Sequence, residues 1–250
     1  MTPILAVALG NTSVAAATAG ADAALRDVGR ASLEALEAFL APRLEAADGP
    51  VIVASVNPPA LERMRRAAET VAADGPHVAG ADFPIPIRAD VAEPARVGTD
   101  RLLAALAARH RAGGACIVVD AGTAVTVDAV DADGTFLGGA IFPGPGLMAR
   151  ALADGTAQLP LVEVGREFVP ERAIGKNTEE AIRFGIMRAL SGAVGGIAAD
   201  MMQVVGTAAP VYITGGYAPP GQGERGVAES VVPDLVLEGL VLAWREHREP

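Results

Sequence analysis

Two short segments of the chain combine residue types that can bind phosphate. Residues 118–128 read VVDAGTAVTVD, so a carboxylate, a glycine and a hydroxyl follow an apolar run. Glycine lets backbone N–H groups converge on an anion, the Thr123 hydroxyl can donate to a phosphate oxygen, and the Asp120 carboxylate can hold a cation or orient a water. Asp and Gly are also common in ordinary turns. A plain hairpin therefore stands as the alternative for this segment.

The second segment lies near the N-terminus, where residues 5–14 read LAVALGNTSV. When Gly10 is aligned with Gly122, the apolar strands, the turns and the hydroxyls correspond. Two such hairpins, each opening one half of the chain, predict a duplicated two-lobe kinase or ATPase with nucleotide in the cleft between lobes. The copies differ at one position, where Ala8 replaces Asp120. A methyl group cannot bind a metal ion or orient a water.

Apolar runs and cap residues predict the elements that position the first hairpin. Residues 3–9, 14–18 and 51–55 favour strands. A helix is expected after Ser32 as its cap, and another after Asn57, because proline suits a first helical turn. A further helix follows the VGTDR segment at 97–101, with Thr99 as its N-cap.

The first turn of that helix leaves two interpretations open. Thr99 and Asp100 are typical of a plain helix start, where the helix dipole favours a carboxylate. Alternatively, Asp100 is a base and Arg101 is an anion clamp. An arginine is electrostatically unfavourable at the positive end of a helix, so its presence there suggests a function such as anion binding.

In the second half we expect a glycine-dense strand and loop over 134–146, a helix over 147–153 and an irregular connection over 154–175. Asn177 to Glu180 resembles a capping box that starts a long helix. Along that helix, small residues recur every three or four positions, which permits close helix packing within the chain, our first expectation, or across a dimer: Gly185, Ala189, Gly192 and Gly196. A strand over 211–213, a glycine turn at 214–216, a mobile segment over 217–230 and a helix over 234–245 complete the chain.

Composition excludes several classes of protein. The formal net charge is −10 with no basic run, and aromatic residues are few, which argues against nucleic-acid binding. The segment around Lys176 lacks the glycine spacing of a P-loop. Cys116 is expected to be a buried small hydrophobe, and the three histidines show no ligand spacing. We find no secretory signal and no uninterrupted apolar span, so we expect a cytoplasmic protein without membrane partners.

Taken together, these segments resemble the type III pantothenate kinases, which catalyse the first step of coenzyme A synthesis. The resemblance runs nearly end to end, and the order and spacing of its motifs carry it: LGNTS at 9–13, ASVNP at 54–58, VGTDR at 97–101, DAGTAVTVD at 120–128, GGAIFPG at 138–144, TAQLP at 156–160, GKNTEEAI at 175–182, TGG at 214–216 and PDLVLEGL at 233–240.

The resemblance implies an α/β fold of two ribonuclease H-like lobes, as in the actin, sugar kinase and acetate kinase superfamily, with an interlobe cleft. We divide the chain into lobes 1–112 and 113–250. The family forms homodimers with the pantothenate site at the subunit interface.

The resemblance also implies roles for residues. Asp100 would be the general base, and Gly98, Thr99, Asp100 and Arg101 would bind pantothenate, with Thr178 reaching it from the partner subunit. Asp120 would hold potassium or ammonium. ATP, with its Mg²⁺, would be held by Thr123 and by the first turn: Leu9, Gly10, Asn11, Thr12 and Ser13.

Three positions depart from the family pattern. Ala8 replaces the Asp of the first motif, Val91 stands where a Tyr usually packs on pantothenate, and Ala104 replaces an Asn. Losing a group that acts on the transition state costs on the order of 10²–10³ in rate. Three hypotheses follow: a working pantothenate kinase, an impaired homologue that acts by binding or regulation, or a kinase for another small hydroxylated acid. The same family contains the Bvg accessory factor, which is associated with transcriptional regulation.

Overall fold

The chain forms two α/β units, each built around one five-stranded sheet. The computed structural model describes residues 3–69, 75–165, 174–217 and 229–248. One unit comprises Met1–Arg111 and Asp234–Pro250, and the other comprises Ala112–Pro233. The pair of α/β lobes expected from the sequence is confirmed.

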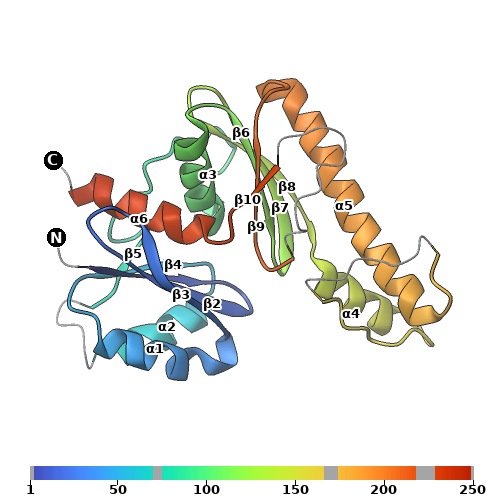
Figure 1. Cartoon of the computed structure of the whole chain (residues 1–250), viewed down its shortest axis with the longest axis horizontal. Helices are drawn as coiled ribbons and strands as arrows, with labels where there is room; N and C mark the ends of the chain where they lie inside the picture. The colour runs from blue at the N-terminus through green and yellow to red at the C-terminus, as the bar shows by residue number, and fades with distance from the viewer. Residues whose placement is uncertain (1–2, 70–74, 166–173, 218–228, 249–250) are drawn as a thin grey trace. The chain divides into compact units, whose positions relative to one another are not determined.

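Unit 1 contains the elements up to α3 and the last helix (Figure 1). Its strands are β1 (Ile4–Leu9), β2 (Ser13–Ala19), β3 (Leu25–Ser32), β4 (Val51–Ser55) and β5 (His77–Val78). Its helices are η1 (Leu33–Ala35), α1 (Leu36–Glu45), α2 (Pro58–Ala68), η2 (Pro94–Arg96), α3 (Thr99–Ala112) and α6 (Leu235–Arg248).

Unit 2 contains the remaining elements. Its strands are β6 (Cys116–Ala121), β7 (Ala124–Val130), β8 (Phe136–Pro143), β9 (Val211–Thr214) and β10 (Glu229–Val231). Its helices are α4 (Pro145–Gly155) and α5 (Thr178–Val205).

The two sheets have the same topology. Their strand orders are β3-β2-β1-β4-β5 and β8-β7-β6-β9-β10. In each sheet the first three strands are antiparallel neighbours, and the first strand also pairs in parallel with the fourth, which pairs in parallel with the fifth. The duplication predicted from two glycine turns therefore extends to all ten strands.

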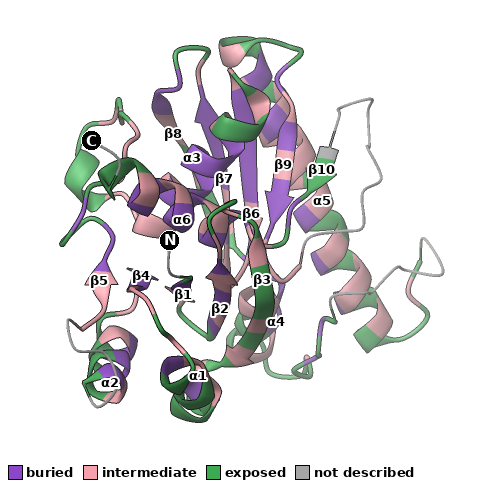
Figure 2. Cartoon of the chain, turned by 60° about the vertical axis from the view of Figure 1, so that its left-hand side comes forward, coloured by how far each residue is buried: buried purple, intermediate pink, exposed green. Residues whose placement is uncertain are grey.

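Alternating side chains divide the core of unit 1 between the two faces of its sheet. Leu5, Val7 and Leu9 belong to the cluster shared with α1 and α2. Ile4 and Ala6 belong to the cluster shared with α3 and α6. Figure 2 shows α1 and α2 with buried residues along one side and exposed residues along the other, as expected for helices that cover a sheet.

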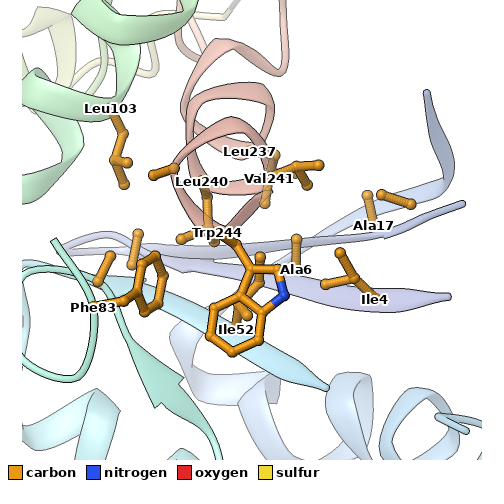
Figure 3. Close-up of a cluster of buried hydrophobic side chains, with 14 of the residues drawn as sticks. Ile4, Ala6, Ala17, Ile52, Phe83, Leu103, Leu237, Leu240, Val241 and Trp244 are labelled. Atoms are coloured by element: carbon orange, nitrogen blue, oxygen red, sulfur yellow. The ribbon is translucent and has the colours of Figure 1, made fainter. Parts of the chain in front are cut away.

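The last helix packs in unit 1, which differs from the division at residue 112 expected from the sequence. Trp244 of α6 is 5% exposed and meets Phe83 edge to face, with ring centroids 5.1 Å apart (Figure 3). A β-carbon on Gly239 would collide with the Leu103 backbone, so α6 approaches α3 closely. Arg111 forms a two-pronged ion pair with Glu238, at 2.6 and 2.7 Å.

In unit 2, α5 packs on one face of the sheet through an apolar stripe that includes Leu190, Ala198 and Met202. Among the described helices, α5 alone is long and apolar enough to cross a membrane. This is weak evidence of a membrane span, because the core helix of a soluble protein can have the same length and composition. Asn177 caps α5 by accepting the Glu180 N–H at 2.9 Å, which confirms the expected helix start.

The small residues of α5 do not pack within the chain as we first expected. No described atom lies within 4 Å of a β-carbon built on Gly185, Gly192, Gly195 or Gly196, apart from the backbone of the helix itself. The glycine face of α5 is therefore not covered by any residue that the structure describes.

Candidate active site

The first glycine turn joins β1 to β2 and is held by backbone hydrogen bonds. Gly10 N–H donates to the Ser13 carbonyl at 2.9 Å, which closes the turn. Leu33 N–H donates to the Thr12 carbonyl at 3.1 Å, and Val56 N–H donates to the Leu9 carbonyl at 3.2 Å. Asn11, Thr12 and Ser13 are exposed in this turn. The turn is thus fixed from both sides while three of its residues face outward.

Asn57 connects this turn to helix α2. Its side-chain oxygen accepts the Ala60 N–H at 3.1 Å and so caps the helix. Its Nδ2 donates to the Gly10 carbonyl at 3.5 Å. From the sequence we predicted only that Asn57 starts a helix. Its second contact joins turns that lie 47 residues apart, so local sequence gives no signal for it.

The VGTDR segment lies against the end of β4. The Thr99 hydroxyl donates to the Ser55 carbonyl at 3.2 Å. The expectation that Thr99 is the N-cap is wrong: Thr99 is the first residue of α3, and Gly98 accepts the first helical bond, from Leu102 N–H at 3.3 Å. The Thr99 hydroxyl does not cap α3 but instead provides a hydrogen-bond donor for the last carbonyl of β4.

Asp100 contributes to this helix start. Its Oδ1 accepts the Arg101 N–H at 2.8 Å, which satisfies one donor of the first turn. A β-carbon built on Gly98 would lie 2.5 Å from the same oxygen, so the carboxylate lies over that glycine. Gly98, Thr99, Asp100 and Arg101 are all partly exposed. Unit 1 thus brings the LGNTS, ASVNP and VGTDR motifs together.

The second glycine turn, in unit 2, joins β6 to β7. Gly122 N–H donates to the Ala124 carbonyl at 3.1 Å. The Thr123 carbonyl accepts the Gly144 N–H at 2.9 Å, and the Ala121 carbonyl accepts the Tyr217 N–H at 2.9 Å. The turn is therefore bonded to the segment before α4 and to the TGG turn after β9.

Gly215 lies directly beside the Asp120 carboxylate. A β-carbon built on Gly215 would lie 2.5 Å from Asp120 Oδ1 and 2.7 Å from Ala121 N, and its φ is +92°. Only glycine meets both conditions without strain. Asp120 and Thr123 are partly exposed. Unit 2 thus brings the DAGTA, GGAIFPG and TGG motifs together.

The other sequence-predicted positions lie outside these two groups. Thr178 is the exposed first residue of α5, and no described contact links it to either turn. Val91 is partly exposed in the loop before η2, and Ala104 is 2% exposed in α3. Part of the segment 217–230, which we expected to be mobile, lies outside the described residues.

Cation ligands are unevenly distributed between the two glycine turns. Asp120 places a carboxylate at the end of β6. The equivalent Ala8 is flanked by Ala15 and Ala54, so that row carries only methyl groups. In the described part of the chain, no group of three or more His, Cys, Asp or Glu side chains could hold a metal. The second turn therefore has a single carboxylate, which suits a singly charged cation, and the first turn has none.

Cys116 is the first residue of β6, the strand that ends at the second glycine turn. Its side chain is fully buried, and this burial raises the pKa of its thiol to about 12. The thiol is therefore neutral at physiological pH, as expected for a small core residue.

Comparison with known proteins gives one consistent family. The family model for type III pantothenate kinase matches residues 4–200. A type III pantothenate kinase from Acidiphilium cryptum is 40% identical over 203 residues, which cover 81% of this chain and 75% of that protein.

Solved structures agree with the fold. A Baf family putative transcriptional activator from Campylobacter jejuni has a TM-score of 0.63 at 18% identity and covers 98% of this chain and 100% of its own. A putative 2-dehydro-3-deoxygalactonokinase from Sinorhizobium meliloti has a TM-score of 0.56 at 18% identity, with 99% and 97% covered. These similarities show the fold alone: both solved structures share the overall architecture of this chain.

Proposed function

Because the chain belongs to the type III pantothenate kinase family, we propose that it transfers the γ-phosphoryl group of ATP to the hydroxyl of pantothenate, giving 4′-phosphopantothenate and ADP. The observation that carries this proposal is the joint placement of three motifs in unit 1. The Thr99–Ser55 and Asn57–Gly10 hydrogen bonds tie the VGTDR segment, the ASVNP segment and the first turn into one arrangement.

In this proposal Asp100 accepts the proton of the pantothenate hydroxyl as its oxygen attacks the γ-phosphorus and the bond to ADP breaks. Asp100 is partly exposed and lies at a helix start. Gly98, Thr99 and Arg101 bind pantothenate around it. Phosphoryl transfer depends mainly on positioning and charge stabilisation, so one base with well-fixed binding groups is sufficient chemistry.

The two glycine turns bind the ATP phosphates. In the first turn, Leu9 to Ser13, Leu9 is buried, and the exposed residues Thr12 and Ser13 offer their hydroxyls. The second turn offers the hydroxyl of Thr123. Asp120 holds potassium or ammonium, and Mg²⁺ accompanies ATP. When bound, such cations offset the negative charge of the phosphates.

The first glycine turn lacks the carboxylate that the second turn carries, which supports a second candidate function. Ala8 and its neighbours Ala15 and Ala54 give the first turn no cation ligand. An impaired homologue that binds ligand and acts as a regulatory protein would need only the binding groups. Val91 keeps a third candidate open, a kinase for another small hydroxylated acid.

One assay separates these candidates. The purified protein is incubated with pantothenate, ATP, Mg²⁺ and K⁺, and 4′-phosphopantothenate is detected by mass spectrometry. Product from the wild type and its loss in Asp100→Asn support the kinase. No product from the wild type, together with product from Ala8→Asp, supports the impaired homologue. In a parallel incubation, other small hydroxylated acids replace pantothenate. A phosphorylated product from one of these acids, with none from pantothenate, supports the third candidate.

We further propose a homodimer in which Thr178 of one chain reaches the pantothenate site of the other. The open glycine face of α5 supports this, because small residues allow the helix of a second chain to approach closely. Gly192→Leu should shift the mass in analytical ultracentrifugation from dimer to monomer. Gly155→Leu, at another open glycine in α4, should not.

We also assign the protein to the cytoplasm, where ATP is available and no disulfide is needed by a chain with one cysteine. Fractionation of source cells with an antibody against the chain tests this: the protein should appear with the cytoplasmic fraction and not with the membranes.

A further inference from the structure

One face of the second sheet carries a row of oxygen-bearing side chains at the end of β6. Asp120 pairs with Thr126 of β7 and with Thr214 of β9. These three side chains share a face, because alternate residues of the same strands enter the core cluster beside α5: Val119, Val127 and Ile213. In an antiparallel pair such as Asp120 and Thr126, the β-carbons lie about 4.5–5.5 Å apart, and the neighbouring parallel strand that carries Thr214 lies about 4.8 Å from β6. The carboxylate and the two hydroxyls are therefore neighbours.

The two hydroxyls differ in their bonding. Thr214 is 3% exposed, and its Oγ1 donates to the Pro233 carbonyl at 3.1 Å, which leaves its oxygen able to accept. Thr126 is partly exposed, and its hydroxyl makes no hydrogen bond to any residue that the structure describes. Thr126 thus presents an oxygen that packing and hydrogen bonding do not use.

The first sheet shows that the fold does not need this polar row. The equivalent row there is Ala15, Ala8 and Ala54, from strands with the same pairing. Ala54 is 2% exposed, and all three methyl groups join the apolar cluster beside α6. Because alanine is compatible with the sheet at the equivalent positions of unit 1, the sheet alone does not explain why unit 2 has oxygen-bearing side chains there.

We propose that the Thr126 hydroxyl oxygen is a second ligand, beside the Asp120 carboxylate, of a monovalent cation in unit 2. Thr214 supports this site as a positioning residue. This inference rests on the proposed function, in which Asp120 holds potassium or ammonium. One carboxylate with neutral hydroxyl oxygens balances a single positive charge and supplies the oxygen donors that a hard cation prefers.

The test measures cation binding without turnover. Potassium chloride replaces choline chloride at constant ionic strength, and the thermal midpoint of the full chain is followed by circular dichroism. A ligand that binds only the folded state raises this midpoint. Thr126→Val should raise the apparent dissociation constant for potassium at least about fivefold, whereas Thr126→Ser, which keeps the hydroxyl, should stay within about twofold of the wild type.

Valine is close in shape to threonine and suits a strand, so the Val variant should fold. Ala15→Thr is the matched control, because it adds a hydroxyl at the equivalent position of unit 1, where no carboxylate stands beside it. It should leave the potassium response unchanged.

The variants separate this inference from the proposed function. If Asp120→Asn loses the potassium response while Thr126→Val keeps it, Thr126 is no ligand, and the Asp120 site stands. If the wild type shows no response, both the cation site and the role of Thr126 are overturned. The phosphopantothenate assay, run separately, decides the kinase activity.

Discussion

Ala8 of β1 and Asp120 of β6 occupy the same position in two sheets of identical topology. Each residue lies in a strand that pairs antiparallel with its successor and in parallel with the fourth strand of its unit. Ala8 is flanked by two alanines and Asp120 by two threonines. The two halves of the chain have therefore kept one backbone arrangement and diverged in the chemistry at the same strand end.

Asp100→Asn should lower kcat/KM for pantothenate about 10²–10⁴-fold, the usual contribution of a general base. Asparagine can still accept the Arg101 N–H through its side-chain oxygen, so the helix start should persist. The measurement is steady-state kinetics with thermal denaturation of both proteins. Wild-type kcat/KM in the Asn variant would overturn the assignment of the base.

Gly215→Ala should destabilise unit 2 and weaken ATP binding. The added methyl group would lie 2.5 Å from Asp120 Oδ1, at a residue with φ of +92°. Backbone strain of this kind costs of order 1–3 kcal/mol. Gly155→Ala is the control, because nothing lies within 4 Å of its β-carbon position. Chemical denaturation and calorimetric ATP titration measure both effects, and equal behaviour of the two variants would contradict the prediction.

Trp244→Ala should destabilise unit 1 by about 3–5 kcal/mol, as for large-to-small changes in a core. The indole packs beside Phe83 in the cluster that joins α6 to the first sheet. Val204→Ala provides the comparison, because Val204 is 77% exposed. Urea unfolding followed by circular dichroism measures both. A loss below about 1 kcal/mol for the tryptophan variant would mean that α6 is dispensable to unit 1.

The Glu37–Arg63 ion pair should make stability depend on acidic pH. The Arg63 guanidinium donates to both Glu37 oxygens, at 2.6 and 2.7 Å, and holds the pKa of that carboxyl at about 2. A lowered pKa stabilises the fold above the unfolded-state value of about 4.3, and this stabilisation is lost as pH falls toward 2.

The measurement compares thermal midpoints of the wild type and Glu37→Gln between pH 2 and 7. Because Glu37 is 52% exposed, the difference above pH 5 should be small, about 1–3 °C. It should shrink as the solution is acidified. A difference that does not vary over this pH range would exclude the ion pair as its cause.

The sequence was sufficient to predict the hairpins, because apolar alternation interrupted by Gly10 and Gly122 specifies strand, turn and strand. It also predicted α2 from Asn57 and α5 from its capping box. Three strands were missed. β3, with the sequence LRDVGRAS, is a mostly polar edge strand that contains Asp27 at φ of 52°, and β5 and β10 have only two and three residues.

Long-range relationships could not be predicted from local patterns. The apolar face of α6 predicts burial but does not say which sheet it covers. Likewise, the contact of Asn57 with Gly10, the closeness of Gly215 to Asp120 and the row that contains Thr126 depend on strand order. The motifs identified the candidate residues, and the sheets determine which of them are neighbours.

The return of α6 to unit 1 has a consequence for biosynthesis. Unit 2 is continuous in the chain, so all of its residues are synthesised before α6. Unit 1 lacks Trp244 and the rest of its α6 cluster until α6 has been synthesised. We therefore expect unit 2 to have its whole sequence available for folding earlier than unit 1, whose sheet is covered by α6 only after unit 2 has been synthesised.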